Sequence, residues 1–198
     1  MELIVSLGVF ISIMTIGMGA VLQMFGLNQK SQSLKTIMVN LNFALDSMAR
    51  EIVVAKVKDT NLHGSSLRCG NADQMNVPQD CTLEDGGDDF LTFCNSDGYA
   101  LAYSFNSVDA SIERLISDSS GCPTTFGTAE WQRITAPEVV IENLTFYVSG
   151  ATNENPGRQP KVLLIVEGEA GVKEDVKSKF EVQTTLSQRT PDLSTVLP

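Results

Sequence analysis

An apolar run without any charge lies near the start of the chain. From residue 3 to residue 27 every side chain is uncharged, and most are Leu, Ile, Val, Met, Phe or Gly. At about 1.5 Å per residue, some 20 apolar residues of helix cross the hydrocarbon core of a bilayer. This run of 25 residues therefore predicts a transmembrane helix whose apolar side chains include Leu3, Ile4, Val5, Leu7, Val9, Phe10, Ile11, Ile13, Ile16, Val21, Leu22 and Phe25.

A cleaved signal peptide is the alternative interpretation of this run. The apolar core of a signal peptide has about 7–15 residues and ends at a cleavage site of small residues. Here the run passes through Gly19 and Ala20 and continues to Phe25. The pattern favours a helix that stays in the protein.

The helical pattern continues beyond the apolar run. Apolar residues then recur at steps of three and four, which is the spacing of one helical face: Leu34, Ile37, Met38, Leu41, Leu45, Met48 and Ile52. No proline precedes Pro78, and no glycine lies between Gly26 and Gly64. We therefore expect one helix from about residue 3 to residue 58, about 80 Å long, whose outer half packs its apolar face on the rest of the chain.

After residue 58 the period of the pattern changes from about 3.6 to 2. Apolar and polar residues alternate in segments that predict strands at residues 90–93, 99–105, 111–116, 139–148, 161–167 and 180–186. Residues 95–98, 149–157 and 168–173 have the composition of turns or loops. The fold class expected is α+β, with a long N-terminal helix packed on an antiparallel sheet. Three regions follow from this: residues 1–27 span, residues 28–58 continue the helix and residues 59–198 form the β-rich domain.

Charge separates the helix from the domain. Residues 1–58 carry five basic and three acidic side chains, whereas residues 59–198 carry nine basic and 21 acidic ones. A domain with a net charge of −12 repels phosphate backbones, so we expect no direct nucleic-acid partner.

Few residues are suited to catalysis. His63 is the single histidine and lies in a polar stretch, which excludes catalytic triads that need a buried histidine. The chain has no nucleophile elbow, phosphate-binding loop or zinc-protease motif. We therefore expect a protein that is not an enzyme and holds no cofactor.

Four cysteines lie in the domain and contain no Cys-x-x-Cys pair: Cys69, Cys81, Cys94 and Cys122. Beyond a membrane span they suit two disulfides in an oxidising compartment, and four separate buried thiols are the alternative. Three pairings are possible. Proximity along the chain favours Cys69 with Cys81 and Cys94 with Cys122.

An acidic loop provides the weak candidate for a metal site. Its carboxylates are Glu84, Asp85, Asp88 and Asp89, and calcium prefers such oxygen ligands. The loop lacks the Asp-x-Asp-x-Asp-Gly spacing and the later glutamate of a calcium loop. A solvated loop without metal is the interpretation that we favour.

The first ten residues carry the resemblance to a known family. Met-Glu-Leu-Ile-Val-Ser-Leu-Gly-Val-Phe resembles the start of type IV pilins and of the pseudopilins of type II secretion, in which a prepilin peptidase cuts after a glycine ahead of Phe-Thr-Leu-(Ile or Met)-Glu-Leu. Glu2 matches the glutamate of that motif. The glycine, the basic leader and the first three mature residues are absent here, and we expect the complete protein to supply them upstream of Met1.

The rest of the chain is similar to the J-type minor pseudopilins in the order of its elements. The similarity is carried by residues 44–52 of the helix, Tyr103 followed by residues 113–115, Trp131 ahead of residues 139–148, and the closing residues 180–187. It extends over most of the domain.

The resemblance implies a function and a set of partners. It implies a structural subunit, an initiating or tip pilin, that is stored in the membrane and assembles through its helix with other pilin or pseudopilin subunits. Glu2 would pair with the terminal ammonium of the adjacent subunit, and prepilin peptidase would process and methylate the full-length precursor. The other partners implied are membrane lipid before assembly and an inner-membrane assembly platform. The chain would cross the inner membrane once, with its domain outside the cytoplasm.

Two alternatives remain open at this stage, one within the pilin class and one outside it. A major pilin of the filament shaft is the closest alternative. A single-pass anchored domain that binds a ligand outside the membrane and does not polymerise is the alternative from a different class, and it would have no use for Glu2.

Overall fold

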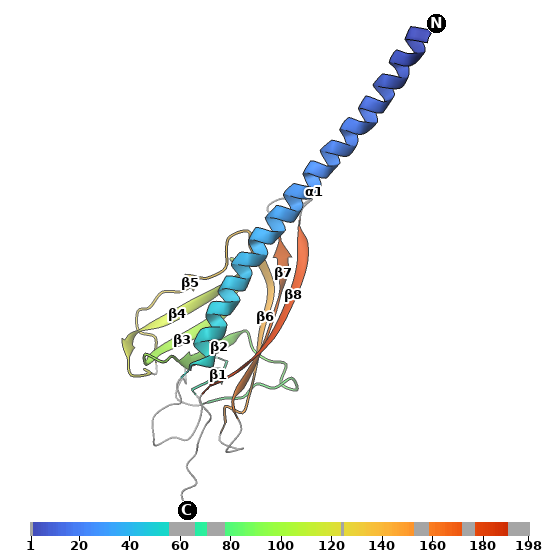
Figure 1. The fold of residues 1–198 in the computed structure, drawn as a ribbon. Helices are drawn as coiled ribbons and strands as arrows, with labels where there is room; N and C mark the ends of the chain where they lie inside the picture. Colours follow the sequence, from blue (N-terminus) through green and yellow to red (C-terminus); the bar gives the residue numbers. More distant parts are fainter. Residues whose placement is uncertain are drawn as a thin grey trace, which may run out of the picture.

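The structure is a computed structural model of the chain. It describes residues 2–55, 66–70, 78–123, 125–152, 159–171 and 177–189. One long helix extends from a β-rich domain, with its N-terminal half projecting away from every strand (Figure 1). The α+β fold class is therefore confirmed.

The helix α1 (Glu2–Val53) has 52 residues and is about 78 Å long at the standard rise. It ends five residues before residue 58, the predicted end. The end of the helix is bonded by another segment, because the Arg189 N–H donates to the oxygen of Val53, the last helical residue, at 2.7 Å, and the Gln188 Nε2 donates to the oxygen of Ala55, two residues further, at 2.6 Å. These bonds cap the helix where it meets the end of the last strand.

The strands form two antiparallel sheets, where the sequence predicted one. In the first, five strands follow one another in chain order: β1 (Arg68–Cys69), β2 (Phe90–Cys94), β3 (Tyr99–Asn106), β4 (Ser111–Ser120) and β5 (Gln132–Arg133). The second has three: β6 (Val139–Ser149), β7 (Lys161–Ala170) and β8 (Ser178–Ser187). The six predicted strands are all present and are one to four residues longer than predicted. The two-residue strands β1 and β5 were missed because they are too short to show an alternation.

The two sheets meet along the edge of β6 without forming a continuous ladder. Isolated bridges join Cys81 to Val148 and Asp88 to Phe146, and the Ile141 N–H donates to the Ala110 oxygen at 2.9 Å. Loop residues thus bond to backbone groups at the edge of β6, where a strand of the first sheet would otherwise pair. This is why the domain has two sheets.

Gly168, predicted as the start of a turn, lies inside β7. It pairs with Ile141 next to a β-bulge in β6. A Cβ atom at this position would collide with the Val140 carbonyl oxygen. The glycine therefore marks a close approach of two strands.

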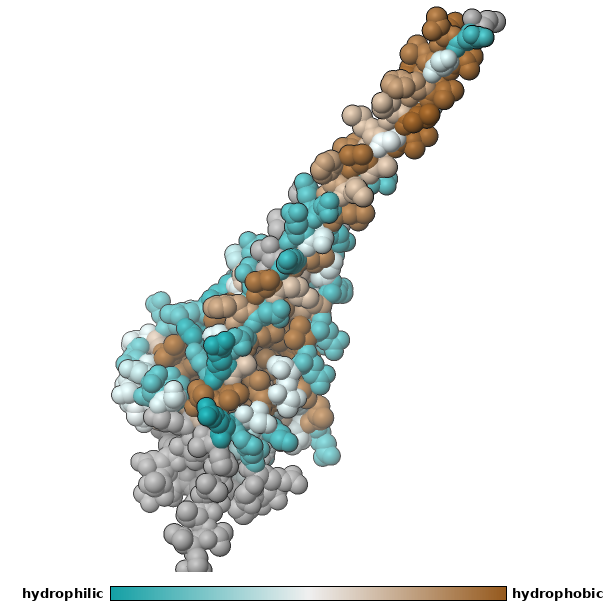
Figure 2. Space-filling view, in the orientation of Figure 1, coloured by the Kyte–Doolittle hydropathy of each residue, from teal (hydrophilic) through white to brown (hydrophobic). Residues whose placement is uncertain are grey.

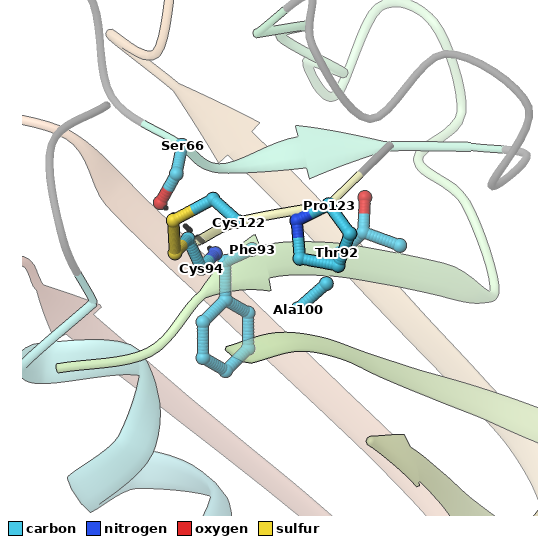
Figure 3. A pocket seen from close by; sticks show the side chains of 7 residues that line it. All are labelled: Ser66, Thr92, Phe93, Cys94, Ala100, Cys122 and Pro123. Carbon is cyan, nitrogen blue, oxygen red and sulfur yellow. Dashed lines mark hydrogen bonds between the residues drawn. A yellow bond between two sulfur atoms is a disulfide. The ribbon is translucent and has the colours of Figure 1, made fainter. Parts of the chain in front are cut away.

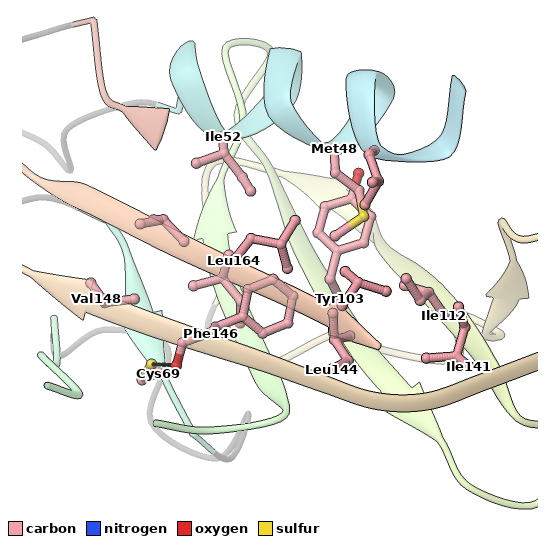
Figure 4. Packing of buried hydrophobic residues seen from close by; sticks show 14 of the residues in the cluster. Met48, Ile52, Cys69, Tyr103, Ile112, Ile141, Leu144, Phe146, Val148 and Leu164 are labelled. Carbon is pink, nitrogen blue, oxygen red and sulfur yellow. Dashed lines mark hydrogen bonds between the residues drawn. The ribbon is translucent and has the colours of Figure 1, made fainter. Parts of the chain in front are cut away.

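The outer half of α1 supplies one side of the hydrophobic core. Met48 and Ile52 are fully buried and pack against Phe146, Leu164 and Tyr103 (Figure 4). Leu41 is fully buried in the same cluster. Of the seven helix residues predicted to pack, Ile37 and Leu45 are also buried and Leu34 is partly buried. Met38 is exposed, because one residue turns the helix by about 100° and places it at the flank of the buried face.

We expect Met48→Ala to lower the free energy of unfolding by about 2–5 kcal/mol, because it leaves a cavity between the helix and the sheets. Asn42→Ala, on the exposed side of the same helix, is the matched control and should change it by less than about 0.5 kcal/mol. Urea unfolding of the full chain in detergent provides the measurement. Equal effects of the two substitutions would contradict the packing described here.

Candidate assembly surface

The free half of α1 is the most unusual surface of the chain. Every described side chain from residue 2 to residue 29 is exposed, and the helix is long and apolar enough to cross a membrane. Figure 2 shows a nearly continuous apolar surface on this half, which gives way to polar residues where the helix nears the domain. All twelve predicted core residues of the span lie here, and none touches either sheet.

The polar side chains within this half bond to the helix itself. The hydroxyl groups of Ser6, Ser12 and Thr15 donate to the carbonyl oxygens of Glu2, Gly8 and Ile11 at 2.7 Å, 2.9 Å and 2.7 Å. Each bond reaches back one turn. The hydroxyl groups therefore need no partner outside the helix, and the half can lie in lipid or against other apolar protein.

Glu2 lies in the first turn of α1. Its exposed carboxylate forms no ion pair with any residue that the structure describes. The partial positive charge of a helix N-terminus favours an acidic side chain there. Within the described chain this glutamate stands alone at the end of an uncharged surface.

A polar anchor fixes the outer half of α1 to the first sheet. The Tyr103 hydroxyl group on β3 donates to Glu51 Oε2, and Arg114 Nη1 on β4 donates to Glu51 Oε1 at 3.2 Å. Burial of the phenol raises the pKa of Tyr103 far above its usual value, and its bond to the charged Glu51 adds to the rise. Glu51 is thus held by two different strands, which sets both the rotation and the height of the helix on the sheet.

Two disulfides close the domain below the helix. Cys69 is bonded to Cys81 and Cys94 is bonded to Cys122, the pairing that chain proximity favours. The second lies beside Ser66, whose hydroxyl oxygen accepts the Cys94 N–H at 3.2 Å (Figure 3). No cysteine is free.

The acidic loop at residues 84–89 uses its carboxylates locally. Asp85 Oδ2 accepts the Thr82 N–H and hydroxyl hydrogen at 3.0 Å and 2.9 Å, and these bonds lower its pKa. Asp88 Oδ1 accepts the Phe90 N–H at 2.9 Å, while burial raises the pKa of this group. Glu84 and Asp89 are exposed. The part of the chain that the structure describes contains no group of three side chains able to hold a metal ion, and His63 lies outside that part.

Two exposed residues of this surface were missed by the sequence analysis. Val39 and Phe43 lie on α1 beyond the predicted span, and 57% and 77% of their respective surfaces are exposed. They fall outside the face that packs on the sheets. Apolar residues at these positions also fit a core, so the sequence alone carries no signal that they are exposed.

Tyr103 should make stability depend on alkaline pH. Above about pH 10 an unfolded tyrosine loses its proton, whereas the folded chain retains that of Tyr103, so the free energy of unfolding should fall as pH rises, by about 1.4 kcal/mol per pH unit for one proton. Tyr103→Phe should remove this share of the slope, and Tyr99→Phe, at a partly exposed position, serves as the control. Unfolding in urea between about pH 9 and 11 measures the slope of the free energy of unfolding against pH. The same slope in Tyr103→Phe as in the unchanged chain would contradict the buried anchor.

The chain has also been compared with known proteins. Models of protein families, curated proteins and solved structures all give no match to it. What the protein does must therefore be inferred from the exposed helix, its polar anchor and the two disulfides.

Proposed function

We propose that the chain is a structural subunit of a type IV pilus or of a type II secretion pseudopilus, and that it assembles through α1. The observation that carries the proposal is the uncharged half of the helix, which is exposed from residue 3 to residue 27. Such a surface must be covered. Lipid covers it before assembly, and the helices of other subunits cover it in the filament.

The continuity of the helix supports a filament subunit. A tether needs only a span and a flexible connection, whereas α1 runs without a break from the span into the core of the domain. The Glu51 anchor and the bonds to Val53 and Ala55 make the helix and the domain one rod. A force on the domain along the helix axis is therefore transmitted directly to the apolar half.

Glu2 has a role in this proposal that it lacks in a simple tether. A carboxylate among apolar side chains is costly unless a cation pairs with it. The resemblance to pilins implies that cation, which would be the terminal ammonium of the adjacent subunit. This pairing would fix the position of one subunit relative to the next.

The disulfides support a place for the domain outside the cytoplasm. Disulfides persist in oxidising compartments, so the domain would lie beyond the inner membrane. The N-terminus would lie at the cytoplasmic face of that membrane. Prepilin peptidase would then act on the precursor, and an inner-membrane platform would add the subunit to the fibre. The similarity to J-type pseudopilins favours a minor subunit that initiates or caps the fibre.

Fibre incorporation tests the proposal. The complete gene product is expressed with its assembly system, fibres are sheared from the cells, and the chain is located by immunogold electron microscopy. We expect it in the fibres. Glu2→Ala would leave the terminal ammonium of the adjacent subunit buried without a partner, and an unpaired buried charge costs about 3–5 kcal/mol. The substitution should therefore reduce incorporation by more than about tenfold and leave membrane insertion intact.

Glu84→Ala, on the exposed acidic loop, is the matched control and should incorporate normally. An unchanged chain that stays in the membrane while the system forms fibres would instead support the anchored binding domain. A chain that is soluble without detergent would also contradict the proposal, since both results exclude transfer of the helix from lipid to protein.

A further inference from the structure

The surface of α1 outside the predicted span has an apolar patch on the side facing away from the domain. Val39 and Phe43, which we call the outer pair, are one turn apart and are exposed. The sheets cover the other side of the helix, where Leu41 and Met48 are buried. The domain therefore leaves the outer pair uncovered.

The outer pair repeats a pair that lies inside the span. Val21 and Phe25, the membrane pair, have the same residue types and the same spacing, and they lie 18 residues earlier. Eighteen residues are five turns of helix, or about 27 Å. The two pairs therefore lie on one line along the helix, and both are exposed.

Charged residues near the outer pair disfavour two helices packing in register. Lys35 lies one turn before Val39, and Arg50 follows Phe43 on the same side. In a parallel pair without offset, Lys35 would face Lys35 and Arg50 would face Arg50, and like charges repel. An antiparallel pair is excluded for subunits that insert into one membrane in the same direction.

An offset of 18 residues matches the two surfaces better. It sets the outer pair of one copy against the membrane pair of the other. The Asp46–Arg50 ion pair of the first copy, at 2.8 Å, then faces the polar residues Asn28 and Gln32 of the second. Lys35 then faces Gly17, around which no atom of the chain would contact an added Cβ, so the lysine side chain has room. Two mismatches remain in this register: Asn28 and Gln32 of the copy nearer the membrane face Phe10 and Met14, and Val53 of the same copy faces Lys35.

We infer that in the assembled filament the outer pair of one copy is covered by the membrane pair of a parallel second copy, displaced by about 27 Å along the axis. The inference rests on the proposed function, in the form of a subunit present in more than one copy in the fibre and not as a single cap, and adds to it the partner of this surface and the register of the contact. The apolar half of the earlier copy would then leave the membrane alongside the anchored half of the next copy.

Cysteine cross-linking in sheared fibres tests the register. Phe25→Cys and Phe43→Cys are made in two differently tagged copies of the complete chain, which are co-expressed and oxidised after assembly. All four native cysteines are already in disulfides, so the introduced thiols are the ones that react. A disulfide needs Cα atoms within about 7 Å.

We expect a dimer that joins Phe25→Cys to Phe43→Cys, and none from Phe43→Cys alone. Val140→Cys, on the outer face of β6, is the control partner for Phe25→Cys and should give no dimer. A dimer of Phe43→Cys with itself would overturn the inference in favour of packing in register. Fibres that form and give no mixed dimer would overturn it too. Absence of the unchanged chain from fibres would instead refute the proposed function.

A second measurement applies if a cysteine variant fails to assemble. Phe43→Leu keeps the outer pair apolar, whereas Phe43→Ser does not, and the substituted position is exposed in the single chain. We expect similar fibre yields for Phe43→Leu and the unchanged chain, and a loss of more than about tenfold for Phe43→Ser. Equal yields from the two variants would show that no subunit covers this residue and would overturn the inference.

Discussion

An uncharged helical surface that its own chain leaves exposed is the constraint on which the rest of the structure depends. The domain buries one face of α1 from Ile37 to Ile52 and nothing before residue 30. Apolar surface of this extent requires a partner, either lipid or protein. The backbone bonds of a helix and the hydroxyl bonds of Ser6, Ser12 and Thr15 make the same surface compatible with both.

The domain is built so that this half-helix is held firmly. Met48 and Ile52 fill the space between two sheets, and Glu51 is bound by Tyr103 and Arg114 from separate strands. Apolar packing supplies most of the attraction in such a core, whereas the polar anchor specifies one rotation of the helix. The two disulfides, Cys69–Cys81 and Cys94–Cys122, restrain the segments beneath it.

The sequence predicted the elements of this fold better than their arrangement. The helix and six strands follow from local periodicity, which is a property of neighbouring residues. The division into two sheets depends on bridges such as Cys81 with Val148, between residues far apart in the chain, and no local pattern contains it. The same holds for the end of α1, which is set by Gln188 and Arg189, the two residues that follow the last strand.

The candidate surface was predictable in its first half and not in its second. A run of 25 uncharged residues identifies the span without a structure. Val39 and Phe43 could not be identified as exposed until the buried face of the helix was known, because apolar residues at those positions also fit a core. Glu51 reads as an ordinary surface acid in the sequence, and its role as an anchor depends on Tyr103 and Arg114 folding back onto it.

The most direct test of the account follows the environment of the apolar half during assembly. Phe10→Trp in a Trp131→Phe background places one tryptophan in the exposed half of α1, and brominated lipids quench tryptophan fluorescence on contact. The account predicts strong quenching in membranes and, in fibres, unquenched emission at the short wavelengths of a buried indole. Quenching that persists while the system assembles fibres, or emission typical of water in the absence of membrane and fibre, would contradict it.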